Sequence, residues 1–149
     1  LIGPPLSGKD TWIRENFSDK DVVMISRDQI VMDVYGSENY DEAFKNVNQK
    51  EVDAKLQSTL RETAKSGNNA IINMTNMTSK RRSHNLNYFG EYTKIAVLFP
   101  ILEAEEYRRR NEKRKMEEQK FIPDHVIMNM ISSYQPIRPE EGFNKVISL

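Results

Sequence analysis

The chain has 149 residues, and 22 Lys and Arg side chains balance 22 Asp and Glu side chains, so it lacks the basic excess that drives non-specific binding to nucleic acid. The absence of cysteine excludes disulfides and thiolate metal sites and fits a reducing cytoplasm, where we expect the protein to reside. Its apolar runs are too short to span a bilayer and it shows no signal-peptide pattern, so we expect no membrane partner.

Short apolar runs alternate with amphipathic stretches along the chain. The runs predict strands at residues 1–2, 22–25, 70–73, 95–99 and 146–149. The stretches predict helices at residues 10–16, 40–66, 79–92, 103–118 and 123–133. This alternation predicts an α/β fold with a parallel sheet, helices on both faces and a single domain over residues 1–149. Because a strand that leads into a loop is usually longer, we expect the chain to be a fragment or to have a trimmed terminus.

The first strand leads into GPPLSGK, which matches the phosphate-binding pattern G-x-x-x-x-G-K between a strand and a helix. Glycines allow positive φ and close backbone approach, so successive amides can bind phosphate at a helix N-terminus. A turn that merely combines glycine, serine and lysine is the alternative, but the strand–loop–helix context favours nucleotide binding. The predicted nucleotide-binding residues of the loop are Gly3, Pro4, Pro5, Leu6, Ser7, Gly8 and Lys9.

Asp10 stands where this pattern usually has a serine or threonine that binds magnesium, and Thr11 follows it. A carboxylate beside phosphates alone would be repelled, but with Mg²⁺ between them it becomes a suitable oxygen ligand. The alternative is that Asp10 only stabilises the first turn of the helix through the helix dipole. Thr11 can donate its hydroxyl to a phosphate in either case.

Arg27 and Asp28 follow the second predicted strand, at the edge of the sheet where ligands gather in open α/β folds. Asp28 could accept the proton of a hydroxyl that attacks a γ-phosphate, and Arg27 could hold an acceptor phosphate. The alternative is that Asp28 is the N-cap of a helix that begins near Gln29.

Two further segments carry polar groups toward the same edge. Thr75 and Asn76 follow the third predicted strand and offer hydrogen bonds to an acceptor, and a basic trio at residues 80–82 comes soon after. Residues 108–115 are rich in Lys and Arg. Arg110 and Arg114 lie four positions apart and can face one way, which is typical of a lid that closes over phosphates, although a solvated helix is the alternative.

The segments GPPLSGKDTW, ISRDQ, IINMTNMTSKRR, RRNEKR and IPDHVI, with the later EGF, together resemble the kinase domain of polynucleotide 5′-hydroxyl kinases across essentially the whole chain. The resemblance implies an adenylate-kinase-like P-loop kinase fold with a helical lid. It also implies ATP and Mg²⁺ as cofactors and an RNA or DNA 5′ end as acceptor. The sequence makes no prediction about oligomeric state.

The resemblance also implies roles for single residues. Lys9 and Thr11 would contact the ATP phosphates, and Asp28 would be the general base that activates the 5′-hydroxyl. Arg114 would be the lid arginine at the β and γ phosphates, with Arg110 supporting it.

Three positions depart from the family pattern. Asp10 replaces the usual serine, Met74 replaces the acidic residue before Thr75, and Val31 stands where some members carry an arginine. A carboxylate is therefore lost on one side of the expected metal site and gained on the other. We expect Asp10 to take over part of the lost function, and Val31 leaves the identity of the acceptor open.

Three functions remain possible at this point. The first is an ATP-dependent kinase for 5′-hydroxyl ends of RNA or DNA. The second is a kinase for a nucleoside or another small alcohol, and the third is a nucleotide- or RNA-binding module without catalysis. Asp10 and Met74 favour the third, whereas Lys9, Asp28 and Arg114 oppose it.

Overall fold

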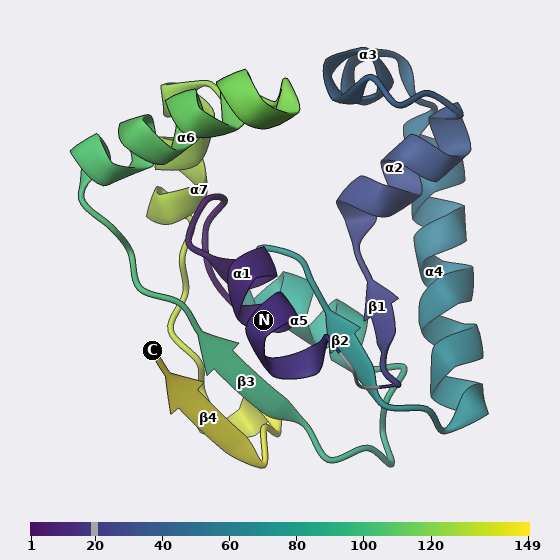
Figure 1. Cartoon of the computed structure of the whole chain (residues 1–149). Coiled ribbons are helices and arrows are strands. Elements are labelled where there is room, and N and C mark those ends of the chain that lie inside the picture. Colours follow the sequence, from purple (N-terminus) through teal and green to yellow (C-terminus); the bar gives the residue numbers. More distant parts are fainter. Residues whose placement is uncertain (19–20) are drawn as a thin grey trace.

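The computed structural model describes residues 1–18 and 21–149. Its strands form two parallel pairs (Figure 1). In one pair, β1 (Val23–Ile25) lies beside β2 (Ala70–Ile72), and in the other, β3 (Ile95–Leu98) lies beside β4 (Lys145–Ser148). Because parallel strands need long crossover connections, the helices fall between them in sequence. The predicted parallel α/β fold is confirmed.

The segment at the beginning of the chain joins the two pairs. The Leu1 nitrogen donates to the Ile72 carbonyl at 3.0 Å, on the β2 side. Ile2 donates to Val97 at 2.9 Å and accepts from Phe99 at 2.8 Å, on the β3 side. The predicted first strand is therefore reduced to a single parallel bridge, but it occupies the centre of the sheet and leads directly into the phosphate loop.

The helices follow the strands in alternation, and three of the five predicted helices agree with the structure within two residues at each end. They are α1 (Lys9–Phe17), α2 (Arg27–Tyr35), α3 (Tyr40–Asn46), α4 (Gln49–Ser66), α5 (Ser79–Leu86), α6 (Ala104–Glu118), α7 (Asp124–Ser132) and the 3₁₀ turn η1 (Pro139–Glu141). Figure 1 shows α6 and α7 on one side of the phosphate loop and α2, α3 and α4 on the other.

The prediction of one helix over residues 40–66 is wrong. Val47 has an extended backbone with ψ of 145°, which ends α3. The Asn48 side chain then accepts from the amides of Lys50 and Glu51 at 3.0 and 3.4 Å and begins α4. Asparagine caps a helix better than it continues one, so a new helix starts here in a different direction. The helix predicted over residues 79–92 also ends early, at Leu86.

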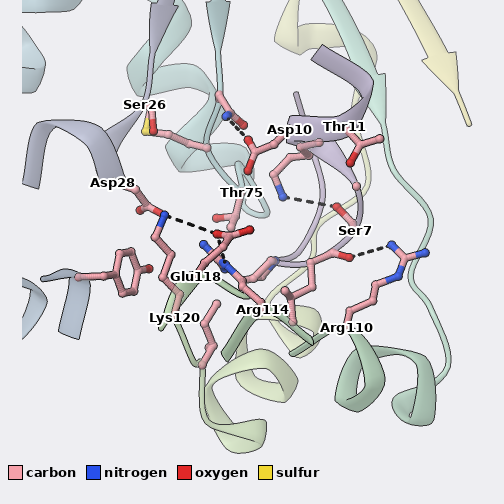
Figure 2. Close-up of a pocket in the computed structure, with 18 of the residues that line it drawn as sticks. Ser7, Asp10, Thr11, Ser26, Asp28, Thr75, Arg110, Arg114, Glu118 and Lys120 are labelled. Carbon is pink, nitrogen blue, oxygen red and sulfur yellow. Dashed lines mark hydrogen bonds and ion pairs between the residues drawn. The ribbon is translucent and has the colours of Figure 1, made fainter. Parts of the chain in front are cut away.

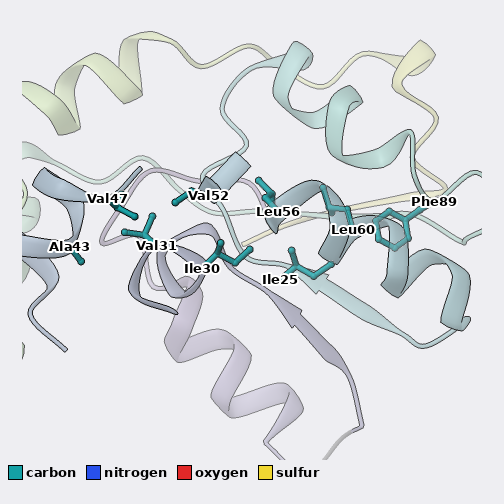
Figure 3. Packing of buried hydrophobic residues seen from close by; sticks show 9 residues of the cluster. All are labelled: Ile25, Ile30, Val31, Ala43, Val47, Val52, Leu56, Leu60 and Phe89. Atoms are coloured by element: carbon teal, nitrogen blue, oxygen red, sulfur yellow. The ribbon is translucent and has the colours of Figure 1, made fainter. Parts of the chain in front are cut away.

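The main hydrophobic core lies between β1 and the helices α2, α3 and α4 (Figure 3). On α4, Val52, Leu56 and Leu60 recur every four residues, so they form one buried face. Full burial of each leucine stabilises the fold by about 1.5–3 kcal/mol. The packed core fixes α2 and α3, whose first turns contribute Asp28 and Tyr40 to the cavity described below. Among the described residues, none of the helices has the length and apolar character needed to cross a membrane.

Candidate nucleotide-binding and phosphotransfer site

A cavity of about 1600 Å³ lies at the carboxyl ends of the central strands. Its walls come from the phosphate loop and α1, from the residues after β1 and β2, from α2 and α3, and from α6 and α7. Ligand sites for one small molecule usually enclose about 300–1,000 Å³, so this cavity has room for a nucleotide and a second substrate.

The phosphate loop has the backbone conformation that the glycine pattern predicts. Leu6 and Gly8 adopt left-handed φ values of 64° and 99°. Gly8 is the N-cap of α1 and provides no side-chain cap, so the first amides of that helix lack a side-chain partner. Free amides at a helix N-terminus, next to left-handed residues, form an anion-binding nest.

Two of the predicted loop residues shape the loop instead of lining the cavity. A Cβ on Gly3 would lie 2.7 Å from the Cβ of Phe99, so only glycine fits there. Pro4 is buried beside it. Residues 5–11 all line the cavity, which makes them the part of the loop that a nucleotide can reach.

Lys9 folds back onto its own loop. Its Nζ donates to the carbonyl oxygens of Gly3 at 2.9 Å and Pro4 at 2.6 Å, and to the Ser7 hydroxyl at 3.4 Å. These partners are neutral, so they satisfy the ammonium group without neutralising its charge. A bound phosphate would supply the missing counter-charge.

The pKa of Lys9 reflects this environment. Burial lowers it to about 8, the nearby carboxylates of Asp10 and Asp28 oppose that shift, and the Arg114 cation adds to it. Three charged groups from α1, α2 and α6 therefore act on one lysine. Lys9 therefore lies in one electrostatic environment with Asp10, Asp28 and Arg114.

Asp10 extends from the first turn of α1 toward the end of β2 (Figure 2). Its Oδ1 accepts a hydrogen bond of 2.7 Å from the Asn73 amide, and both residues line the cavity. Within the described part of the chain, no group of three or more His, Cys, Asp or Glu side chains could hold a metal. Mg²⁺ in nucleotide sites uses only one or two carboxylates together with phosphate oxygens and water. The donors present therefore fit a nucleotide-bound Mg²⁺ but not a metal held by protein alone.

Asp28 lies in the first turn of α2 and lines the cavity. Ser26 is the N-cap of this helix, since its hydroxyl accepts from the Gln29 amide at 3.4 Å. The alternative that Asp28 is the cap is therefore wrong, and its carboxylate remains accessible from the cavity. Partial desolvation raises the pKa of Asp28 above its ordinary value, and the Arg114 cation is the main group that opposes this shift.

Arg114 reaches the cavity from α6 and is largely shielded from solvent (Figure 2). Its Nε lies 3.5 Å from Glu118 Oε2, and the Lys120 Nζ lies 3.7 Å from the same oxygen. One carboxylate thus holds two cations beside the cavity. Lys9, Asp28 and Arg114, distant in sequence, all line this one cavity.

Arg110 connects α6 to the phosphate loop. Its Nη1 donates to the Leu6 carbonyl at 2.9 Å, and its Nε donates to Glu106 at 2.6 Å (Figure 2 shows the first contact). Hydrogen bonds from Arg109 and then Arg110 lower the pKa of Glu106 to about 2, so it remains charged. The guanidinium of Arg110 therefore sits at the mouth of the loop where phosphate oxygens would lie.

Three residues singled out for the acceptor side have different positions. Thr75 lines the cavity. Arg27 does not, because its guanidinium donates to Gln49 at 2.7 Å and lies 3.5 Å from Asp53, both on α4. Asn76 is buried below the cavity and donates to the Leu1 carbonyl at 2.8 Å.

The basic trio at residues 80–82 contains a buried ion pair. Arg82 donates through Nε and Nη2 to the Glu141 carboxylate at 2.6 and 2.7 Å, and the two side chains are 1% and 3% exposed. Arg82 also donates to the carbonyls of Asn76 and Met77. It therefore holds the segment after β2, which borders the cavity, in place. Sequence alone offered no partner for Arg82.

Sequence reasoning missed four residues that surround the site: Asn73, Glu106, Lys120 and Tyr40. Asn73 ends a predicted strand, and its position at the sheet edge was the available signal. Tyr40 and Lys120 carry no motif, and only the tertiary structure brings them to the cavity.

A family profile for the AAA domain matches residues 1–137. A search of curated proteins found no match. The matched range includes the phosphate loop, Asp28 and the arginines of α6, so it covers the cavity walls almost entirely. The loop geometry and this match agree that the chain carries a P-loop nucleotide-binding domain of the kinase-like type, and it belongs to the AAA domain family.

Proposed function

We propose that this protein is an ATP-dependent phosphotransferase that transfers the γ-phosphate of ATP to a 5′-hydroxyl end of RNA or DNA. The observation that carries the proposal is the shared cavity of Lys9, Asp28 and Arg114. A phosphate-binding lysine, a carboxylate with a raised pKa and a lid arginine are the groups that transfer to an alcohol requires.

In the proposed reaction, Asp28 accepts the proton of the acceptor hydroxyl. The hydroxyl oxygen forms a bond to the γ-phosphorus while the bond from that phosphorus to the β–γ bridging oxygen breaks, so that ADP leaves. The loop amides and Lys9 hold the phosphates, and Arg114 neutralises charge on the group in transfer. Catalysis of this kind is largely positioning and electrostatic stabilisation.

Asp10 is the residue we propose for the metal, directly or through water. Mg²⁺, when bound, neutralises charge on the β and γ phosphate oxygens. Asn73 donates to one carboxylate oxygen of Asp10, which fixes the side chain toward the cavity. Met74, which also lines the cavity, contributes no charge there.

A second candidate is a kinase for a nucleoside or another small alcohol, and two observations favour it. Arg27 is engaged by α4, and Val31 is fully buried in the core. Neither α2 position therefore offers a cation to a phosphate beside the acceptor hydroxyl. For the first candidate, we propose Lys45 and Lys120, two of the cations that line the cavity, for this purpose.

A panel of acceptors tests the proposal. The protein is incubated with γ-labelled ATP, Mg²⁺ and either 5′-hydroxyl oligonucleotides of RNA and DNA, the same oligonucleotides with a 5′-phosphate, or free nucleosides. We expect label only on the 5′-hydroxyl oligonucleotides. Label on nucleosides alone would establish the second candidate, and ATP binding with no labelled acceptor would leave only a nucleotide-binding module.

A further inference from the structure

Tyr40 has no role in the reaction as described above, yet local contacts fix its ring in the cavity wall. It is the first residue of α3, and Asn39 caps this helix by accepting the Glu42 amide at 3.0 Å. The ring of Tyr40 stacks on Phe44, one turn later, with the ring centres 4.3 Å apart. Both rings line the cavity, and both are half-buried.

The same ring contacts functional groups from two other segments. Burial and, after it, the nearby carboxylate of Asp28 on α2 raise the pKa of the Tyr40 phenol well above its ordinary value. The guanidinium carbon of Arg114 lies 5.7 Å from the ring centre, and the Lys120 Nζ lies 5.3 Å from it. Both distances are within the range of cation–π attraction. Tyr40 thus lies near the proposed base and within cation–π range of two cations.

These contacts complement one another. Arg114 and Lys120 repel each other, and they share a single carboxylate, Glu118. The negative face of an aromatic ring offers both cations a second attractive partner without adding a charge that would compete for Mg²⁺ or phosphate. A phenol can also donate to a carboxylate without neutralising it, so a hydrogen bond from Tyr40 would orient Asp28 and leave it able to accept a proton.

We propose that Tyr40 is a positioning residue of the phosphotransfer site: its hydroxyl orients Asp28, and its ring holds Arg114 and Lys120 beside the cavity. The inference rests on the proposed phosphotransferase function and assigns Tyr40 a place in it. The placement of Arg114 and Lys120 and the alignment of Asp28 then depend on one side chain. An aliphatic residue of similar size would keep the packing on Phe44 but lose both functions.

Two substitutions separate the hydroxyl from the ring. Tyr40→Phe keeps the ring and removes the hydroxyl, and Tyr40→Leu removes both. Tyr35→Phe is the matched control, because the Tyr35 hydroxyl donates to Glu42 at 3.2 Å and lies outside the cavity. Steady-state kinetics, ATP affinity by calorimetry without acceptor, and thermal melting are measured for each variant.

For Tyr40→Phe we expect kcat to fall by about tenfold while KM for ATP stays within about twofold, since the proposed hydrogen bond to a charged group is lost. For Tyr40→Leu we expect a similar loss of kcat and, in addition, ATP affinity lower by about fivefold, since the cation contacts are lost as well. Tyr35→Phe should match the wild type in kcat and affinity. Wild-type kcat in Tyr40→Phe, or losses that only follow a lowered melting temperature, would overturn the inference.

Calorimetry keeps this test distinct from that of the proposed function. If the wild type labels no acceptor, the proposed function has failed and the role of the hydroxyl fails with it. The role of the ring is then decided by ATP affinity alone. Weaker binding in Tyr40→Leu but not in Tyr40→Phe supports it, and equal binding in both variants overturns it.

Discussion

Nucleotide binding is expected to draw a proton onto Lys9. In the free protein burial lowers the pKa of this lysine to about 8, and its Nζ has only neutral partners on the loop. A triphosphate surrounds the ammonium group with negative charge, which favours the protonated form and returns the pKa toward its ordinary value of about 10.4. At pH 8 about half of the free molecules carry the proton and nearly all complexes do, so binding should take up about half a proton. At pH 7 the uptake should fall to about one tenth.

Titration calorimetry at pH 8, in two buffers with different ionisation enthalpies, measures this uptake directly. The direction of proton transfer also fixes the pH dependence of binding. Because the complex binds more protons than the free protein, ATP affinity falls as pH rises through 8. Lys9→Arg is the matched control, since arginine stays charged at this pH and cannot take up a proton. The reasoning would be refuted by a wild type that takes up no proton at pH 8, or by equal uptake in Lys9→Arg.

Two further substitutions test the structure and the metal proposal. Glu141→Gln leaves the buried Arg82 without a counter-charge and should cost about 3–5 kcal/mol in chemical denaturation, whereas Asp124→Asn in an exposed pair should cost under about 1 kcal/mol. Hydrogen bonds from Arg82 lower the pKa of Glu141, so the ion pair contributes to stability above the unfolded-state pKa of 4.5, and this contribution is lost as pH falls through the lower pKa of the folded state. An equal loss of stability in Glu141→Gln and Asp124→Asn would contradict the role of the buried ion pair. Asp10→Ser, which also loses the Asn73 contact, should raise the Mg²⁺ concentration needed for half-maximal turnover by several-fold, and an unchanged requirement would remove Asp10 from the metal proposal.

The fold was largely predictable because its signals are local. Continuous apolar runs such as residues 95–99 locate the strands, and G-x-x-x-x-G-K fixes the turn that follows the first of them. The break between α3 and α4 was not predicted, because the helical stripe continues through Val47 while the Asn48 cap interrupts it. Propensity alone does not decide whether an asparagine within a helical pattern caps or continues.

The candidate site was less predictable on its acceptor side. Position at a strand end correctly indicated that Asp28 and Thr75 would reach the cavity. The same argument placed Arg27 and Asn76 there. The long side chain of Arg27 instead turns back to α4, and Asn76 points into the core. Tyr40 was missed because its contacts are all tertiary, apart from its stacking on Phe44.

The central claim is that Asp28 acts on an acceptor beside a nucleotide held by Lys9 and Arg114, and the Asp28→Asn variant tests it most directly. Single-turnover transfer of labelled phosphate is measured together with ATP affinity by calorimetry. We expect transfer to fall by about 10²- to 10⁴-fold while ATP affinity changes by less than about threefold, since asparagine keeps the shape but cannot accept the proton. Transfer at the wild-type rate, with ATP bound normally, would contradict the account.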